Sequence, residues 1–168
     1  MNVNELPIMN MDKEETGCCP KFNPEGWDGQ EIVFENKKFV KANTKSFMHI
    51  PLNMGPVYTR TCAEIEKVDA FPKDYYLILS IDPSAWKSEH FFAVEKDVPG
   101  LEMVTLSGKF ITKVVEGPYK DAPKFMKEME EYLKTKNLEA KKMYFFYTTC
   151  PKCGKHYGKN YMVIFAEI

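Results

Sequence analysis

A Gly-Pro turn followed by an amphipathic helix is the sequence feature that most limits how this chain can fold. Residues 110–115, rich in β-branched and aromatic side chains, predict a strand, and the chain then turns at Gly117-Pro118. After the turn, apolar residues recur at spacings of three and four, which places them on one face of a helix: Ala122, Phe125, Met126, Met129, Tyr132 and Leu133. Asp121 is expected to cap this helix, and Pro123 is tolerated in its first turn.

The same order of features occurs earlier in the chain. Gly55-Pro56 precedes a second stretch with apolar residues at helical spacing, namely Val57, Cys62, Ile65 and Val68. Each unit then continues with two apolar runs that predict strands, at residues 76–81 and 91–94 in the first and 143–149 and 161–164 in the second. This recurrence predicts an internal duplication, with repeats at about residues 44–98 and 103–168.

Length and composition favour one globular domain. The chain has 168 residues, of which 44% are hydrophobic, so it can bury a sizeable core. Its 23 basic and 24 acidic residues form no basic stripe, so nucleic acid is not an expected partner. No apolar run approaches the roughly 20 residues of a membrane-spanning helix, and no secretory signal pattern is present, so no membrane partner is expected. Five cysteines, an odd number, suggest a reducing, cytoplasmic location.

The N-terminal part reads differently from the rest. Residues 1–24 are expected to be a flexible tail and a loop, and residues 25–168 the single α+β domain. Residues 31–35 and 38–42 flank Asn36-Lys37, which predicts a hairpin, and residues 47–52 predict the first strand of the first repeat.

Several predicted strands are apolar along their whole length rather than alternating, so both faces of the sheet require cover: 76–79, 144–147 and 162–165. The two predicted helices can cover one face. We expect the opposite face to be an aromatic cleft that the N-terminal loop, a partner chain or a ligand closes, and packing by the N-terminal segment as ordinary core is the alternative.

These features together resemble the GyrI-like small-molecule-binding domains over about residues 31–168. The resemblance rests on Gly108-Lys109-Phe110, Glu116-Gly117-Pro118-Tyr119, the helix ending at Leu133, the strands at 144–149 and 161–168, Gly55-Pro56 and Ile81-Asp82-Pro83. It implies an α+β fold of duplicated strand–helix–strand–strand units, with an antiparallel sheet, two helices on one face and a ligand cleft along a pseudo-two-fold axis.

The resemblance also implies a class of function. The chain is similar to stand-alone members, and its Cys18-Cys19-Pro20 and Cys150-Pro151-Lys152-Cys153 segments resemble a subgroup labelled hydrolase, acting on small reactive compounds. Members commonly carry a glutamate two residues before a tyrosine in the pocket. Here that tyrosine is Tyr147 and the earlier position is Phe145, so a cation-binding or hydrolytic site built on that carboxylate is not implied.

The cysteines form a separate candidate site, and four interpretations of it stay open. Cys150 and Cys153 have the C-x-x-C spacing of a zinc knuckle, and Cys18 and Cys19 could complete four ligands, although adjacent side chains are expected to diverge. A redox pair is the second interpretation, but no long helix is expected after the motif because Gly154 and Gly158 follow closely. A nucleophilic thiol with His156 as its base is the third, and inert cysteines are the fourth.

The remaining candidates concern the cleft. Trp86 is expected on a loop at its mouth, with Phe145 and Tyr147 stacking on the ligand and Tyr58 directing its hydroxyl inward. Glu116 and Tyr119 are the candidate catalytic groups, with water as the nucleophile in any hydrolysis. Two histidines are assigned no role: His49 is expected to be half-buried and His90 to be exposed.

We therefore expect a domain that binds a small hydrophobic or aromatic molecule and that, if it is an enzyme, hydrolyses it. The alternatives are a protein-interaction module that uses the aromatic face and a zinc-stabilised structural domain. No cofactor other than zinc is expected.

Overall fold

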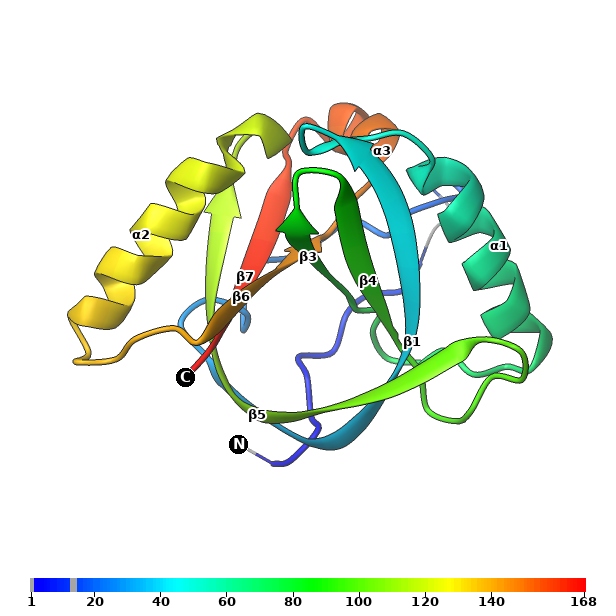
Figure 1. Cartoon of the computed structure of the whole chain (residues 1–168), viewed down its shortest axis with the longest axis horizontal. Helices are drawn as coiled ribbons and strands as arrows, with labels where there is room; N and C mark the ends of the chain where they lie inside the picture. Colours follow the sequence, from blue (N-terminus) through cyan, green and yellow to red (C-terminus); the bar gives the residue numbers. More distant parts are fainter. Residues whose placement is uncertain (1, 13–14) are drawn as a thin grey trace.

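The chain folds into a closed antiparallel barrel with helices packed on its outside (Figure 1). The computed structural model describes residues 2–12 and 15–168; residues 1, 13 and 14 of the predicted tail lie outside the described part. The elements run β1 (Glu31–Phe47), β2 (Ile50–Pro51), α1 (Met54–Lys67), β3 (Ile78–Ser84), β4 (Lys87–Ala93), β5 (Glu102–Glu116), η1 (Tyr119–Asp121), α2 (Ala122–Lys134), β6 (Lys142–Tyr147), α3 (Pro151–Tyr157) and β7 (Tyr161–Glu167).

Pairing between β1 and β5 closes the sheet. Within the described residues the strand order is β2-β1-β4-β3-β6-β7-β5, and β5 pairs again with β1, so six strands form the barrel and β2 extends it. Both β1 and β5 are long, with 17 and 15 residues, and they cross at the bottom of the view in Figure 1.

The predicted hairpin at residues 31–42 is wrong. Both of its halves belong to β1 and pair with the same neighbour, β5, and the register shifts between Phe34 and Lys37. Asn36 has a positive φ of 48°, which makes a bulge rather than a reversal of the chain. The predicted strand at 47–52 is also broken, because a turn at Met48 and His49, both with positive φ, separates β1 from β2.

The interior of the barrel is a packed core, so the predicted aromatic cleft opposite the helices is wrong. Its largest fully buried side chains include Trp27, Phe34, Phe39, Phe110, Phe146 and Phe165. The segment before β1 contributes to this core through Met9, Phe22 and Trp27. The all-apolar strands thus have one face inside the barrel and the other under the helices, and the division of the chain at residue 24 stays a prediction.

Helices α1 and α2 lie on opposite sides of the barrel wall (Figure 1). Under α2, Phe125, Met129 and Leu133 are buried, which confirms the predicted helix. Met126, predicted on the same face, is instead 38% exposed. Asp121 occupies the N-cap position, but its side chain makes no capping hydrogen bond. Under α1, Ile65 packs with residues of β1 and β4 in a separate cluster. The order strand, helix, strand, strand occurs twice along the chain, and the duplication itself stays a prediction.

Gly117 is required at the turn before α2. Its φ is +155°, and a Cβ atom there would lie 2.8 Å from Cζ of the buried Phe125 ring. We expect Gly117→Ala to lower the free energy of unfolding by about 2 kcal/mol or more, from backbone strain and overpacking. Urea denaturation measures this change. Gly55→Ala is the matched control, since a Cβ there meets nothing within 4 Å and alanine favours the helix. Equal effects of the two substitutions would contradict the prediction.

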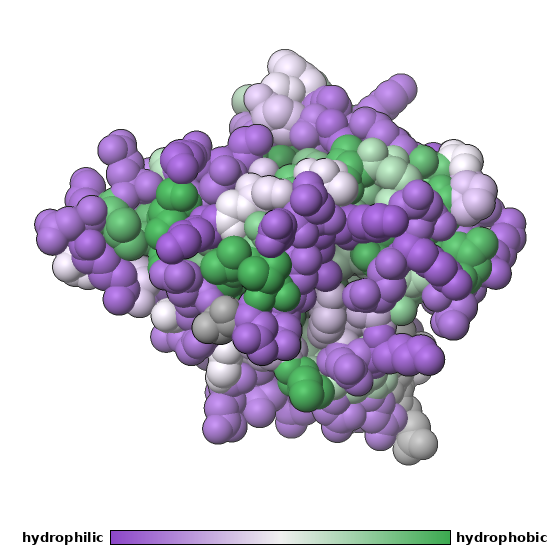
Figure 2. Space-filling model, turned by 90° about the horizontal axis from the view of Figure 1, so that it is seen from below, coloured by the Kyte–Doolittle hydropathy of each residue, from purple (hydrophilic) through white to green (hydrophobic). Residues whose placement is uncertain are grey.

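The surface shown in Figure 2 is mostly hydrophilic and is interrupted by small hydrophobic patches. Within residues 2–12 and 15–168, no helix combines the length and hydrophobicity needed to cross a membrane.

Candidate functional site

A row of aromatic side chains lies on the helix side of the sheet at the end of β6. Phe145 and Tyr147 are two residues apart on β6 and so point to the same face. Their rings stack with centroids 5.7 Å apart and an interplanar angle of 9°. Phe145 belongs to the cluster under α2, and Tyr147 packs against that cluster while only partly buried. The pair forms a flat aromatic platform beside α2.

Tyr119 extends this row from the turn that precedes α2. Its ring lies 5.4 Å from the Tyr147 ring at an interplanar angle of 69°. Its hydroxyl donates a hydrogen bond of 2.6 Å to the carbonyl oxygen of Thr149. Burial raises the pKa of Tyr119 to about 12, so the phenol stays protonated at neutral pH. Tyr119 therefore links the aromatic row to the segment that leads into α3.

Tyr58 approaches the same region from α1. Burial is the main cause of the raised pKa of Tyr147. Electrostatic interactions with Asp82, Tyr58 and Tyr119 raise this pKa further, in that order. Of these groups, Tyr119 is in ring contact with Tyr147, and Tyr58 and Asp82 act on it electrostatically. Of the sequence-predicted residues, Tyr119, Phe145 and Tyr147 thus come together through ring contacts, whereas Tyr58 on α1 is linked to Tyr147 electrostatically.

A buried histidine holds Tyr58 in place. His90 Nδ1 lies 2.9 Å from the Tyr58 hydroxyl and 2.7 Å from Ser80 Oγ, and its Nε2 lies 2.9 Å from Thr44 Oγ1. Burial lowers the pKa of His90 to about 4, so the ring is neutral at pH 7. Burial also raises the pKa of Tyr58 to about 12, so its phenol stays protonated at neutral pH. The expectation that His90 is exposed is wrong, because only 1% of its surface is accessible.

The contact between Ser80 and His90 has the geometry of a nucleophile and its base. Both residues are buried, with 4% and 1% of their surfaces exposed. A substrate does not reach Ser80 in this conformation, so we assign the pair a structural role. It fixes α1 against β3 and β4 through a fully hydrogen-bonded polar cluster.

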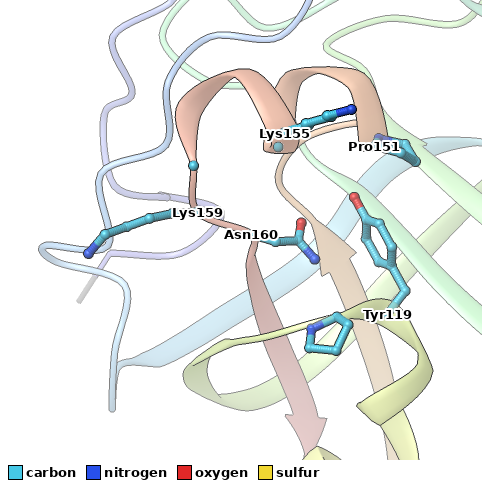
Figure 3. A pocket seen from close by; sticks show the side chains of 8 residues that line it. Tyr119, Pro151, Lys155, Lys159 and Asn160 are labelled. Carbon is cyan, nitrogen blue, oxygen red and sulfur yellow. The ribbon is translucent and has the colours of Figure 1, made fainter.

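A groove of about 430 Å³ opens beside Tyr119, between the turn before α2 and helix α3 (Figure 3). It is lined by Pro118, Tyr119, Pro151, Gly154, Lys155, Gly158, Lys159 and Asn160. The Tyr119 hydroxyl points toward α3, and the Asn160 amide points toward Tyr119 (Figure 3). The volume lies in the range of small-molecule sites. The groove therefore continues the aromatic row along a mainly apolar surface.

Asn160 and Gly154 shape the floor of this groove. Asn160 donates a hydrogen bond of 2.7 Å to the carbonyl oxygen of Gly117. Its Oδ1 and the Thr149 Oγ1 are buried without a hydrogen-bond partner. A Cβ on Gly154 would lie 3.3 Å from Thr149 Oγ1 and 3.4 Å from Asn160 Oδ1. A glycine at 154 therefore leaves room for these two polar atoms.

A second groove, of about 610 Å³, lies between the N-terminal segment and β1, one of the two strands that close the barrel. Lys37 Nζ donates to the Tyr75 hydroxyl at 2.6 Å, and that hydroxyl donates to Glu95 at 3.2 Å. Burial lowers the pKa of Lys37, an effect that Glu95 partly offsets. The lining includes none of the sequence-predicted site residues.

Trp86 and Glu116 lie away from the aromatic row. Trp86 is 58% exposed in the turn between β3 and β4, and its ring lies 5.4 Å from that of Phe47. Glu116 is exposed at the end of β5, next to Val115, which packs under α2, so the two side chains point to opposite faces.

The turn that carries Trp86 has an exposed apolar neighbour. Phe47, Met48, Ile50 and Leu52 are all more than half exposed, and we call them, with Trp86, the apolar tip. His49, within this tip, is exposed rather than half-buried, and its Nδ1 lies 3.3 Å from Asp82.

The structure brings Cys18, Cys19, Cys150 and Cys153 together. Their sulfur atoms all lie within 4.8 Å of one another. The expectation that adjacent cysteines diverge is wrong, because the sulfurs of Cys18 and Cys19 are 3.7 Å apart. His156 is not part of this group, and its Nε2 lies 3.1 Å from Glu15.

The fold and these contacts define an α+β barrel domain with an aromatic row on its outer wall. The chain belongs to the family described as bacterial hydrolase, whose model matches residues 9–168. No curated protein matches the chain in sequence.

Two solved structures are similar in fold. One is an uncharacterized conserved protein from Listeria innocua, with a TM-score of 0.58 and 11% identity, covering 83% of this chain and 91% of that one. The other is SAV2435 bound to tetraphenylphosphonium, with a TM-score of 0.51 and 14% identity, covering 83% of this chain and 93% of that one. At these identities the likeness shows the fold alone, and the resemblance to GyrI-like domains stays a prediction.

Sequence reasoning missed the polar residues of the site. His90, Ser80 and Thr44 are far apart in sequence, and their contact depends on the order of β1, β4 and β3 in the sheet. Asn160 carried one usable signal in the sequence, because it directly precedes the closing strand. Its contact with the Gly117 turn depends on the pairing of β5 with β7.

Proposed function

We propose that this protein binds a small hydrophobic or aromatic molecule against the row formed by Tyr58, Tyr119, Phe145 and Tyr147. The observation that carries the proposal is the partly buried Tyr147 ring, with the buried Phe145 ring stacked on it and Tyr119 packed on its edge. Aromatic rings give a flat ligand a large contact area and a preferred orientation. The hydroxyl of Tyr119 donates its proton to the Thr149 carbonyl, so its oxygen is available to accept a hydrogen bond from a ligand. The groove beside Tyr119, whose lining is mainly apolar, provides volume for a further part of the ligand.

The fold neighbour bound to tetraphenylphosphonium supports a ligand rich in aromatic rings. In this chain Phe145 occupies the position where the resemblance led us to look for a carboxylate. A positively charged ligand would therefore depend on Asp82, the carboxylate whose charge raises the pKa of Tyr147. We therefore expect aromatic contact to contribute more than charge to the affinity for the ligand.

Tetraphenylphosphonium is the probe for this proposal. We expect calorimetric titration to detect binding to the full chain, and Tyr147→Ala to weaken the affinity about tenfold through loss of ring contact. Tyr132→Ala is the matched control: Tyr132 is also a half-buried tyrosine, but it contacts Lys113 and Lys136 away from the row. Equal losses in the two variants, or no binding of this probe or of planar aromatic compounds, would count against the site.

Hydrolysis is the second candidate, and the family description favours it. Glu116 and Tyr119 stay the predicted catalytic groups, with water as the nucleophile. Product formation by the wild-type chain, lost in Tyr119→Phe while ligand binding persists, would support turnover. Binding without product would leave a ligand-binding protein.

A protein-interaction module is the remaining candidate, and the apolar tip is the observation that favours it, because clustered exposed apolar side chains often mark interaction sites. Trp86→Ala separates the two ideas. A change in the affinity for the small probe assigns the tip to the ligand site, whereas an unchanged affinity leaves the tip as a surface for a protein partner.

A further inference from the structure

We propose that Cys18, Cys19, Cys150 and Cys153 form a structural zinc site that fastens the N-terminal segment to the barrel. The four sulfurs lie within 4.8 Å of one another, with 3.7 Å between Cys18 and Cys19 and 4.0 Å between Cys18 and Cys150. A tetrahedral zinc ion with zinc–sulfur bonds near 2.3 Å requires sulfur–sulfur separations of about 3.8 Å. The cluster is thus close to the size that zinc demands.

The local fold explains how the sulfurs converge. Cys150 is the N-cap of α3 and Cys153 lies three residues later, so both side chains lie on one side of this short helix. Gly158, with φ of 71°, ends the helix. The sequence did not predict α3, because Gly154 and Gly158 both disfavour a helix after the motif. The glycine at 154 is instead accommodated within the helix.

The facing loop is held by hydrogen bonds to α3. The hydroxyl of Tyr157 donates to the carbonyl oxygen of Cys19 at 2.7 Å, and the hydroxyl of Thr16 donates to the same oxygen at 3.1 Å. The backbone N–H of Cys150 donates to Cys19 Sγ at 3.4 Å. An N–H donor to sulfur stabilises a metal-bound thiolate and fixes its direction. The loop is therefore ordered around the sulfurs in the way that a metal site requires.

The number and type of donors assign the role. Four cysteine thiolates complete the coordination of zinc and leave no position for substrate, so the site is structural rather than catalytic. Binding replaces the four thiol protons with one Zn²⁺ ion, and the protons pass to solvent. A disulfide would join two of the sulfurs at about 2.05 Å and leave the other two outside it. The observed grouping of all four favours the metal.

A zinc ion bound by these four cysteines would link the N-terminal segment to α3, and the two are far apart in the sequence. Phe22, three residues after Cys19, is buried in the barrel core, where its ring lies 5.7 Å from Trp27 and 6.2 Å from Phe146. Fastening the loop at residues 18–19 to α3 thus holds the segment that fills the barrel. The site acts on stability and does not depend on the proposed ligand.

Metal analysis of the purified full chain tests this inference. We expect one zinc per chain, reduced at least tenfold in Cys18→Ser and in Cys150→Ser, but retained in Cys62→Ser, whose cysteine lies on α1 outside the cluster. Cobalt should replace zinc in the wild-type protein and give the intense visible absorption of a tetrahedral thiolate site. This second readout does not depend on whether the serine variants fold.

Chelation provides the measure of stability. Removing zinc with a strong chelator is expected to lower the Tm by roughly 10 °C, and zinc, but not magnesium, should restore it. Wild-type protein that contains no zinc and gives no tetrahedral cobalt spectrum would overturn the inference. So would mass spectrometry, without reduction, that finds a disulfide among the four cysteines of freshly isolated protein.

Discussion

Replacing Trp27 with alanine is expected to lower the free energy of unfolding by about 3–5 kcal/mol. Trp27 is 1% exposed, and its ring contacts Phe22, Phe146 and Phe165 at centroid distances of 5.7, 5.6 and 6.4 Å. Its carbonyl oxygen also accepts a hydrogen bond from the buried hydroxyl of Thr112. Truncation leaves a cavity at the centre of the barrel that neighbouring rings cannot fill. Urea denaturation followed by far-UV circular dichroism measures the loss.

Trp86→Ala is the matched control for this experiment. Trp86 is 58% exposed, so its removal is expected to change the unfolding free energy by about 0.5 kcal/mol or less. If both substitutions cost the same, or if Trp27→Ala is nearly neutral, the segment before β1 does not fill the barrel as described.

Lowering the pH from 7 to 4 is expected to remove about 3 kcal/mol of stability through His90 alone. Folded His90 takes up a proton only near pH 4, whereas an unfolded histidine does so near pH 6.5. Between these values the unfolded state binds more protons, so the stability present at neutral pH is lost as the pH falls through this window. Burial is the main cause, and Asp82 opposes it weakly.

The contribution of His90 can be separated from that of the carboxylates by comparison with His90→Gln. The variant should be less stable than the wild type at pH 7, and its stability should fall less steeply between pH 6.5 and 4. His49→Gln is the control, since His49 and its partner Asp82 are both largely exposed. Parallel pH profiles for the wild type and His90→Gln would show that His90 is not held neutral by burial.

Local sequence patterns predicted the parts of the fold that local physics controls. The spacing of Phe125, Met129 and Leu133 fixes the buried face of α2, and Gly117 marks the turn before it. The apolar runs that became β6 and β7 were also recognised. Barrel closure could not be predicted, because it depends on pairing between β1 and β5, and the bulge at Asn36 resembles a turn in sequence.

The candidate site was predictable to the extent that its residues flank recognisable turns and strands. Tyr58 and Tyr119 follow the Gly-Pro pairs, and Phe145 and Tyr147 share one face of an apolar strand. The role of His90 could not be predicted from its position in the sequence. His90 lies in the polar run before β4 becomes apolar, and only the sheet order reveals that Ser80 and Thr44 meet it inside.

Closure of the barrel by β1 and β5 affects how the chain can fold as it is synthesised. β1 is made early, but much of its ladder partner lies some seventy residues downstream, as in the pairing of Lys37 with Leu106. Until β5 emerges, β1 presents an unpaired edge to other nascent chains, and β3 likewise waits for β6. Contacts so distant in sequence slow folding. A holdase that shields this temporary edge during translation should therefore raise the yield of native protein more than one that acts after release.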